Sequence, residues 1–293
     1  MLSGLTARSW EGRVMGTDAR LVVVTVDQTA GRLALLRAAE DLRATEEALS
    51  RFWEHSELSR LNRLGTVIAG GRLLTAVREA VRAYEWSGGL LDPRVICSLE
   101  NFGYGEGVPG GDVGGARPAE PLSPVDMSGW VDESGRISLP PGVRLDLAGV
   151  GKALGIGWAA AHLAGHAGLL VDVGGDVISL GTDDGGEPWN VAIMHHEPVG
   201  QFSGRSLAVA TSTTRKRAWT AGGEEAHHLI DPRTGAPSRG DLAYATVSAP
   251  TILEADLAAK LLIIGGRAAL SRLDDRLEAV VTDREGLTEV RAA

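Results

Sequence analysis

The second half of the chain alternates between strand-like and helix-like segments that meet at glycines, and this alternation constrains the fold more than any other feature. Residues 143–149 (VRLDLAG) predict a strand, Gly149-Val150-Gly151 a turn, and residues 152–165 a helix. LLVDVGGDVISLG then predicts a strand interrupted at Gly174-Gly175, and WNVAIMH and SLAVATS predict two more. In the last third, YATVSAP predicts a strand, residues 252–264 an apolar helix, and residues 277–292 a hairpin.

The first half adds a strand and two helices. Residues 20–26 are rich in β-branched side chains, which is typical of a strand. Leu35, Leu42 and Leu49 recur every seven residues, and this spacing predicts a helix over residues 32–52 that packs one face on a core. A second helix is predicted over residues 75–86. The Gly- and Pro-rich residues 103–123 predict an irregular connection too short to separate domains, so we expect residues 1–293 to form one domain.

Charge and composition exclude several function classes. With 29 Lys and Arg against 38 Asp and Glu, the 293-residue chain carries a formal net charge of −9, which repels nucleic acid and anionic lipid. Its apolar stretches are far shorter than the roughly 20 residues of a membrane helix, so we expect no membrane insertion. The start of the chain lacks the apolar region of a signal peptide, and the single Cys97 leaves no internal disulfide. We therefore expect a cytoplasmic protein.

The run from Gly149 to Gly155 imitates two nucleotide-binding motifs. A dinucleotide fingerprint needs Gly or Ala three residues after its second Gly, where this chain has Leu154. A P-loop needs Gly at the position of Asp146 and Ser or Thr at that of Ala153. Ser212 lacks the flanking glycines of a hydrolase nucleophile. The sequence therefore disfavours nicotinamide enzymes, P-loop NTPases and serine hydrolases.

Two glycine groups at the ends of predicted strands indicate a phosphate ligand. Gly149 and Gly151 precede Lys152, and Gly174-Gly175 precede Asp176. Glycines let backbone N–H groups approach a ligand closely, a helix start attracts negative charge, and an ammonium neutralises it. These features predict a pyrophosphate site. For Lys152 taken alone, the alternative is a solvated helix residue.

Titratable side chains also gather between His227 and Gly235. His228, Asp231, Arg233 and Thr234 place an imidazole, a carboxylate, a guanidinium and a hydroxyl in one turn. Structural turns rarely need all four groups. We predict that His228 is a general base, and that His227 is an ordinary structural histidine.

A further charged pair lies on the last long helix, near Glu254. Asp256 and Lys260 are four residues apart and therefore share a helix face. They form either an ordinary surface ion pair or part of a site. The second interpretation gains support because the chain has only three lysines and otherwise uses arginine.

In this order, the clusters resemble the FAD:protein FMN transferase (ApbE-like) family, over residues 14–266. The block His228 to Gly235 (HLIDPRTG) is the most specific match. The other matching motifs are Met15-Gly16-Thr17, Ser56 to Asn62, Leu91-Asp92-Pro93, Leu145-Asp146-Leu147 with Gly151-Lys152, Gly174-Gly175-Asp176 and Ala210-Thr211-Ser212. Each motif is weak alone, but seven in the same order are a specific signal.

The resemblance implies an α+β, T-fold-related domain of two lobes, with mixed or antiparallel sheets and packed helices, and FAD in a cleft. It also implies that FMN moves from FAD to a Ser or Thr of an acceptor flavoprotein, that AMP is released, and that Mg²⁺ holds the pyrophosphate. His228, Asp231, Arg233 and Thr234 are then the catalytic residues. The expected FAD-binding residues are Met15, Gly16, Thr17, Phe52, Asp92, Gly149, Gly151, Lys152, Gly174, Gly175, Asp176, Thr211 and Ser212. The metal ligands map to Asp256 and the main-chain carbonyl of Gly151.

The role of Phe52 stays open: it stacks on a ring of FAD, or it closes the core at the end of the first helix.

The chain departs from the family pattern at four positions. Lys260 stands where the family has a Thr near the metal, so we expect Mg²⁺ to bind weakly or to be replaced by the ammonium. Arg94 replaces a Thr, Thr213 a Gly and Gly157 an Asp. Two alternatives to transfer stay open because they need the same FAD site: an FAD-binding protein without transfer, acting as a flavin carrier or redox partner, and an FAD pyrophosphatase.

Overall fold

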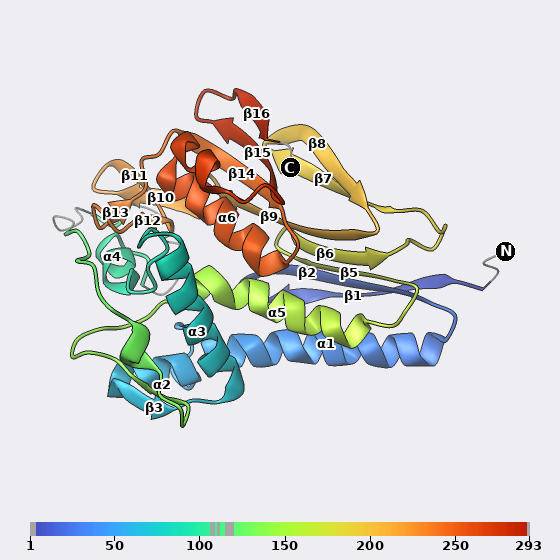
Figure 1. Cartoon of the computed structure of the whole chain (residues 1–293), viewed down its shortest axis with the longest axis horizontal. Helices are drawn as coiled ribbons and strands as arrows, with labels where there is room; N and C mark the ends of the chain where they lie inside the picture. Colours follow the sequence, from blue (N-terminus) through green and yellow to red (C-terminus); the bar gives the residue numbers. More distant parts are fainter. Residues whose placement is uncertain (1–3, 106–108, 110–111, 115–119, 292–293) are drawn as a thin grey trace.

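The computed structural model describes residues 4–105, 109, 112–114 and 120–291. Its centre is one eight-stranded sheet in the order β1-β2-β5-β6-β9-β14-β15-β16, in which every neighbouring pair is antiparallel (Figure 1). The strands are β1 Thr6–Val14, β2 Thr17–Thr25, β5 Gly168–Val173, β6 Asp176–Gly181, β9 Ser206–Thr213, β14 Leu242–Ser248, β15 Glu278–Asp283 and β16 Thr288–Arg291. The α+β prediction is confirmed, and the described sheets are antiparallel rather than mixed.

Three helices cover one face of this sheet: α1 Gln28–Leu49, α5 Ala148–Leu163 and α6 Ile252–Gly265 (Figure 1). The heptad leucines of α1 are buried as the spacing predicts, because Leu35 and Leu42 pack with Val23 of β2 and Ile156 of α5. The Asp27 side chain accepts hydrogen bonds from the first N–H groups of α1, so the helix begins four residues before the predicted start.

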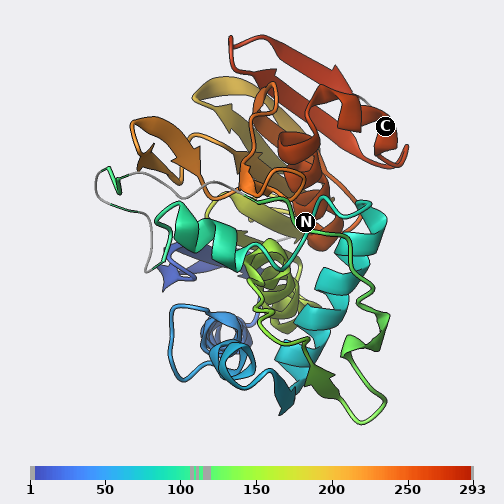
Figure 2. The same cartoon turned by 90° about the vertical axis from the view of Figure 1, so that its left-hand side faces the viewer.

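A second lobe lies beside the ends of α1 and α5. It contains α2 Glu57–Leu64, β3 Thr66–Ile68, α3 Gly71–Trp86, the short helix Ser128–Trp130 and β4 Arg136–Ser138. Leu58, Leu73, Trp130 and Ile137 form its own apolar core. Viewed from the end, this lobe lies below the C-terminal half of the sheet (Figure 2).

A hairpin covers the face of the central sheet opposite the helices, and several short elements complete the fold. The hairpin β7 Trp189–His195 and β8 Glu197–Gly204 packs Val191 against Val177 and Val209. Ala208 and Ala210, which alternate with Val209, face the helices, so this hairpin covers the opposite face of the sheet. The remaining elements are α4 Ile96–Asn101, β10 Ala218–Ala221, β11 Glu224–His227, β12 Ile230–Asp231, β13 Ala236–Pro237 and the short helix Arg267–Arg272.

The strand predicted over residues 143–149 is wrong. This segment is an extended loop whose hydrogen bonds come from side chains: the Asn62 amide donates to the Leu145 carbonyl at 2.9 Å, and the Leu145 N–H donates to the Asn62 carbonyl oxygen at 2.8 Å. The side chain of Asp146 accepts from the Ala148 N–H at 2.7 Å, which starts α5 there. Gly149 and Gly151 therefore lie in the first turn of α5 instead of in a turn before it.

The other local predictions differ mainly in extent. The predicted strand with an interruption at Gly174-Gly175 is a pair of strands, β5 and β6, joined by these two residues at positive φ. The terminal hairpin is confirmed, whereas β1 and β8 were not predicted. Much of the connection 103–123 lies outside the described residues. Within the described part, no helix is long and apolar enough to cross a membrane. That residues 1–293 form one domain stays a prediction.

Candidate functional site

A cavity of about 1320 Å³ lies where the two lobes meet the ends of the central strands. It exceeds the roughly 300–1000 Å³ typical of small-ligand pockets. Fifteen of the predicted residues line it: Met15, Gly16, Thr17, Phe52, Asp92, Gly149, Gly151, Lys152, Gly174, Gly175, Thr211, Ser212, His228, Asp256 and Lys260. The fold thus brings together residues that are up to 245 positions apart (Lys260 and Met15).

The first turn of α5 is fixed in the cavity wall by a buried ion pair. Arg51 Nε lies 2.9 Å from Asp146 Oδ2, and the two side chains are only 5% and 7% exposed. The same guanidinium donates to the Tyr104 carbonyl at 2.7 Å and lies over the Phe52 ring, 4.2 Å from its centroid. Arg51 therefore ties the end of α1 to the start of α5 and to the loop after α4.

Phe52 lies at the mouth of the cavity and is 47% exposed. Its ring makes an edge contact with Tyr104 at 5.9 Å between centroids. The neighbouring Trp53 is similarly exposed and also lines the cavity. An exposed ring in the cavity lining is available to stack on a ligand, and stacking on a ring of FAD stays a prediction.

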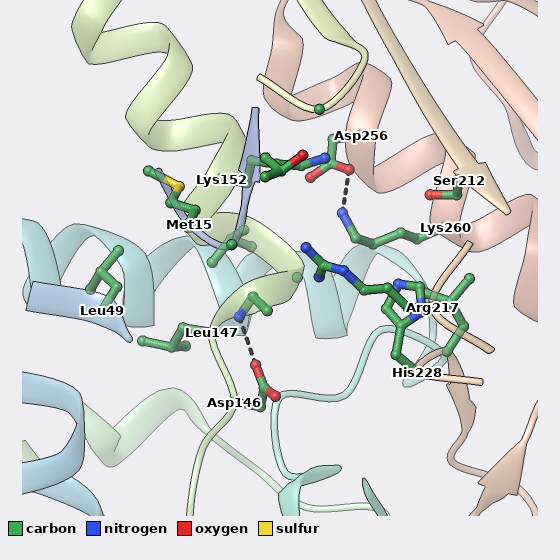
Figure 3. Close-up of a pocket in the computed structure, with 18 of the residues that line it drawn as sticks. Met15, Leu49, Asp146, Leu147, Lys152, Ser212, Arg217, His228, Asp256 and Lys260 are labelled. Atoms are coloured by element: carbon green, nitrogen blue, oxygen red, sulfur yellow. Dashed lines mark hydrogen bonds and ion pairs between the residues drawn. The ribbon is translucent and has the colours of Figure 1, made fainter. Parts of the chain in front are cut away.

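Two lysine–carboxylate ion pairs lie in the wall. Lys152 of α5 pairs with Asp176 of β6, whose other oxygen accepts from the Thr211 N–H at 3.1 Å. Lys260 pairs with Asp256 one turn earlier on α6, as the spacing predicts (Figure 3). Asp176 itself does not line the cavity but holds Lys152 there. The buried Asp256 Oδ2 has no hydrogen-bond partner among the described residues.

Burial and neighbouring charge act in opposite directions on these pairs. Burial disfavours the ammonium of Lys152, but the carboxylates of Asp176 and Asp256 outweigh it and raise the Lys152 pKa. Burial raises the pKa of Asp256, and the Lys260 ammonium opposes that rise.

His228 lines the same cavity beside Arg217 (Figure 3). Its Nδ1 is buried and has no hydrogen-bond partner in the described part of the chain. Burial, followed by the charges of Arg217 and other nearby cations, lowers the His228 pKa to about 3. The imidazole is therefore neutral and holds a nitrogen lone pair that can accept a proton.

The rest of the predicted catalytic turn folds on itself. The Asp231 carboxylate accepts from the Arg233 N–H and guanidinium at 2.8–3.2 Å, and the Thr234 hydroxyl donates to the Asp231 carbonyl at 3.2 Å. None of these three is among the cavity residues. They shape the loop that presents His228. His227 is buried beside them, and its Nε2 lies 2.8 Å from the Ser238 carbonyl oxygen, in agreement with a structural histidine.

A chain of hydroxyl groups reaches the cavity wall through a buried histidine. Thr211 Oγ1 lies 2.8 Å from Thr246 Oγ1, which lies 2.8 Å from His195 Nε2. His195 Nδ1 lies 2.7 Å from Thr282 Oγ1, and its ring stacks on Tyr244 at 5.0 Å. Burial lowers the His195 pKa to about 4. This network anchors the β7–β8 hairpin to the sheet and orients the hydroxyl of Thr211.

Comparison with known proteins decides the family. The sequence model of the ApbE family matches residues 15–281. The chain belongs to the ApbE family. It is 29% identical over 273 residues to the FAD:protein FMN transferase of Klebsiella pneumoniae. This alignment covers 86% of this chain and 76% of that protein. With the FAD:protein FMN transferase of Salmonella typhimurium it is 28% identical, over 96% of this chain and 83% of that protein.

Solved structures of the family share the fold. The ApbE protein of Thermotoga maritima superimposes with a TM-score of 0.81 at 22% identity, over 98% of this chain and 97% of that one. The flavin transferase ApbE of Vibrio cholerae gives a TM-score of 0.77 at 23% identity, over 99% and 97%.

The structure shows the surroundings of the four residues that depart from the family pattern. Arg94 binds the carboxylate of Asp92, which is itself in the cavity wall. The Thr213 hydroxyl donates to the Ala243 carbonyl at 2.8 Å, and Gly157 leaves open space on α5. Lys260 changes the chemistry most, because its ammonium occupies Asp256 Oδ1.

The sequence analysis missed five cations that line the cavity: Arg13, Arg20, Arg51, Lys216 and Arg217. Arg217 lies four residues beyond the end of β9, in the run Arg215-Lys216-Arg217. The run was visible in the sequence and follows the recognised Ala210-Thr211-Ser212 motif. Nothing local, however, shows that Lys216 and Arg217 line the cavity and that Arg215 does not.

Proposed function

We propose that this protein transfers FMN from FAD to a Ser or Thr hydroxyl of an acceptor flavoprotein and releases AMP. The observation that carries the proposal is the presence of a neutral imidazole, His228, in the same cavity wall as Lys152, Lys260 and the glycine turns. Family membership and the relatives named FAD:protein FMN transferase support it.

The transfer is a displacement at phosphorus in which one bond forms, one bond breaks and one proton moves to His228. The acceptor oxygen attacks the phosphorus of the FMN half, the bond from that phosphorus to the bridging oxygen breaks, and AMP leaves with the bridging oxygen. His228 takes the hydroxyl proton. A phosphate anion beside Arg217, Lys152 and Lys260 offsets the positive charges that contribute to the low His228 pKa, so substrate binding makes the imidazole a stronger base.

The glycines and the aromatic rim have binding roles in this proposal. Gly174 and Gly175, both at positive φ, carry no side chain where the β5–β6 turn meets the cavity, so a ligand can approach the backbone closely. Their N–H groups donate to the Asp18 carbonyl and to the Asp172 carboxylate, each at 2.9 Å, and these bonds hold the turn in place. Phe52 and Trp53 offer ring faces at the mouth. Thr211, held by Thr246, offers an oriented hydroxyl.

Two buried carboxylates at the cavity wall are engaged by lysines and are not free to bind magnesium. Of the two buried carboxylates, Asp176 is engaged by Lys152 and Asp256 by Lys260. The side chains present therefore do not fit a magnesium site.

Release of AMP tests the proposal and separates its alternatives. The purified protein is incubated with FAD, with and without an acceptor flavoprotein, and AMP is measured by chromatography. AMP only with acceptor supports transfer, AMP without acceptor indicates a pyrophosphatase, and FAD binding without AMP indicates a carrier.

Substitution of the two histidines tests the base. We expect His228→Ala to abolish transfer and to change FAD affinity only a few fold, because a general base acts on the chemical step. His227→Ala serves as the control and should lower stability but leave most of the transfer. Equal loss of transfer in both variants would contradict the assignment of His228.

A further inference from the structure

The side chains around Asp256 leave little room for a divalent cation. The Lys260 ammonium is bonded to Asp256 Oδ1, and Oδ2 is the one oxygen of this carboxylate without a partner among the described residues. Mg²⁺ requires near-octahedral oxygen ligands and is repelled by an ammonium on the same carboxylate. One free carboxylate oxygen beside a fixed positive charge is a poor site for it.

Cationic side chains outnumber carboxylates at this place. Lys152 interacts electrostatically with Asp176 and Asp256, and Lys260 interacts with Asp256. Arg217 lies close enough to interact with Lys152 and with His228. The two lysines use the two carboxylates, whereas Arg217 has no hydrogen bond or ion pair within the described chain. In Figure 3, Lys152 of α5, Lys260 of α6 and Arg217 of the loop between β9 and β10 lie in the same part of the cavity wall. Asp172 and Lys216 also line the cavity and interact with each other, and their formal charges cancel. The group therefore carries one excess positive charge.

Excess positive charge in a partly enclosed site favours an anionic ligand. The guanidinium of Arg217 matches two phosphoryl oxygens at once, and the ammonium groups of Lys152 and Lys260 act as point charges. The N-terminal turn of the 16-residue helix α5 also contributes positive potential beside Lys152.

We propose that Lys152, Lys260 and Arg217 together bind the pyrophosphate of FAD and take the place of a divalent metal in this protein. The inference rests on the proposed use of FAD and adds how its phosphates are held. Lys260 keeps its contact with Asp256 in the complex, and Arg217 makes the direct phosphoryl contact. The three cations also oppose the negative charge that develops on the phosphoryl oxygens during displacement.

FAD binding with and without divalent metal is the first test. Flavin fluorescence quenching measures FAD affinity in excess EDTA and in millimolar Mg²⁺. We expect affinities that agree within about twofold, and no Mg²⁺ binding heat in calorimetry with FAD present. Loss of FAD binding in EDTA with recovery in Mg²⁺ would overturn the inference and leave the proposed function standing.

Two arginines of the same run give a matched pair of variants. Arg217→Gln should weaken FAD binding about 10-fold or more, since a bidentate charged contact is lost. It should leave the affinity for riboflavin, which has no phosphate, unchanged. Arg215→Gln is the control, because Arg215 is exposed and pairs with Glu225 outside the cavity. Equal FAD affinity in the two variants would refute the role of Arg217.

Lys260→Thr tests the replacement of the metal directly. It frees Asp256, so we expect Mg²⁺ binding to appear and FAD affinity to become sensitive to EDTA. Unchanged metal independence in this variant would count against Lys260. Failure of the wild-type protein to bind FAD under both metal conditions would instead reject the proposed function.

Discussion

Protonation of His195 should make the fold lose stability in mild acid. The imidazole is 4% exposed and bridges Thr246 and Thr282, two residues of neighbouring strands. Its pKa is lowered to about 4 by burial, against an unfolded value of about 6.5. As the pH falls below 6.5, the imidazole therefore binds a proton in the unfolded chain but stays neutral in the folded chain, and this difference favours unfolding.

The size of the effect follows from that difference. Each pH unit between the two pKa values costs about 1.36 kcal/mol, so lowering the pH from 6.5 to 5 removes at most about 2 kcal/mol of stability. The loss continues toward pH 4 and then stops, because below that value both states are protonated.

Urea unfolding of the wild type and of His195→Gln at pH 7.5 and pH 5 measures this contribution. The variant loses the hydrogen bonds at both pH values, but it has no imidazole to protonate. We expect its stability deficit relative to the wild type to shrink by up to about 2 kcal/mol at pH 5. Other histidines cancel in this difference, and His55→Gln, at an exposed position, is the control. A deficit that stays the same at both pH values would refute the reasoning.

Two further substitutions test how the cavity is built. Arg51→Met should lower the free energy of unfolding by about 3–5 kcal/mol, because it leaves the buried Asp146 carboxylate without its ion-pair partner. Arg63→Met, at an exposed position, is the control and should leave the free energy of unfolding unchanged. Equal denaturation midpoints of the two variants would contradict the buried ion pair. Gly174→Ala should destabilise by about 1–3 kcal/mol and weaken FAD binding, since its φ is +66° and a Cβ would lie 2.7 Å from Thr17 Oγ1. Thermal unfolding measures it against Gly149→Ala, where no atom lies within 4 Å, and a Gly174→Ala protein as stable as Gly149→Ala would show that the turn is not strained.

Sequence patterns predicted the helices, strands and turns that depend on residues close together in the chain. The seven-residue spacing of Leu35 and Leu42 gave α1 its buried face, and the glycines at 174 and 175 gave the β5–β6 turn its positive φ angles. A run rich in β-branched residues likewise indicated β2, and the segment YATVSAP indicated β14. Periodicity and backbone freedom depend on neighbouring residues, so the sequence alone carries them.

The loop at residues 143–149 shows where local reasoning ends. Its alternation of apolar and polar residues is that of a strand, and Leu145 and Leu147 are buried as in a strand. The backbone nevertheless pairs with the side chain of Asn62, more than 80 positions earlier. Hydrogen bonds to a distant partner satisfy the same groups that a sheet would, and no local pattern distinguishes the two.

The sequence by itself determined the family, the α+β class and fifteen of the residues that line the cavity, because each motif is a short run of specific side chains. Apart from the pair Asp256 and Lys260, which are four residues apart on one helix, only the tertiary structure decided which charges pair. Lys152 could have been a solvated helix residue, but the packing of α5 on β6 places it against Asp176. Arg217 turns into the cavity while Asp231 and Arg233 bind each other in their own turn. Electrostatic energy depends on distance and burial, and both are set by elements far apart in the chain.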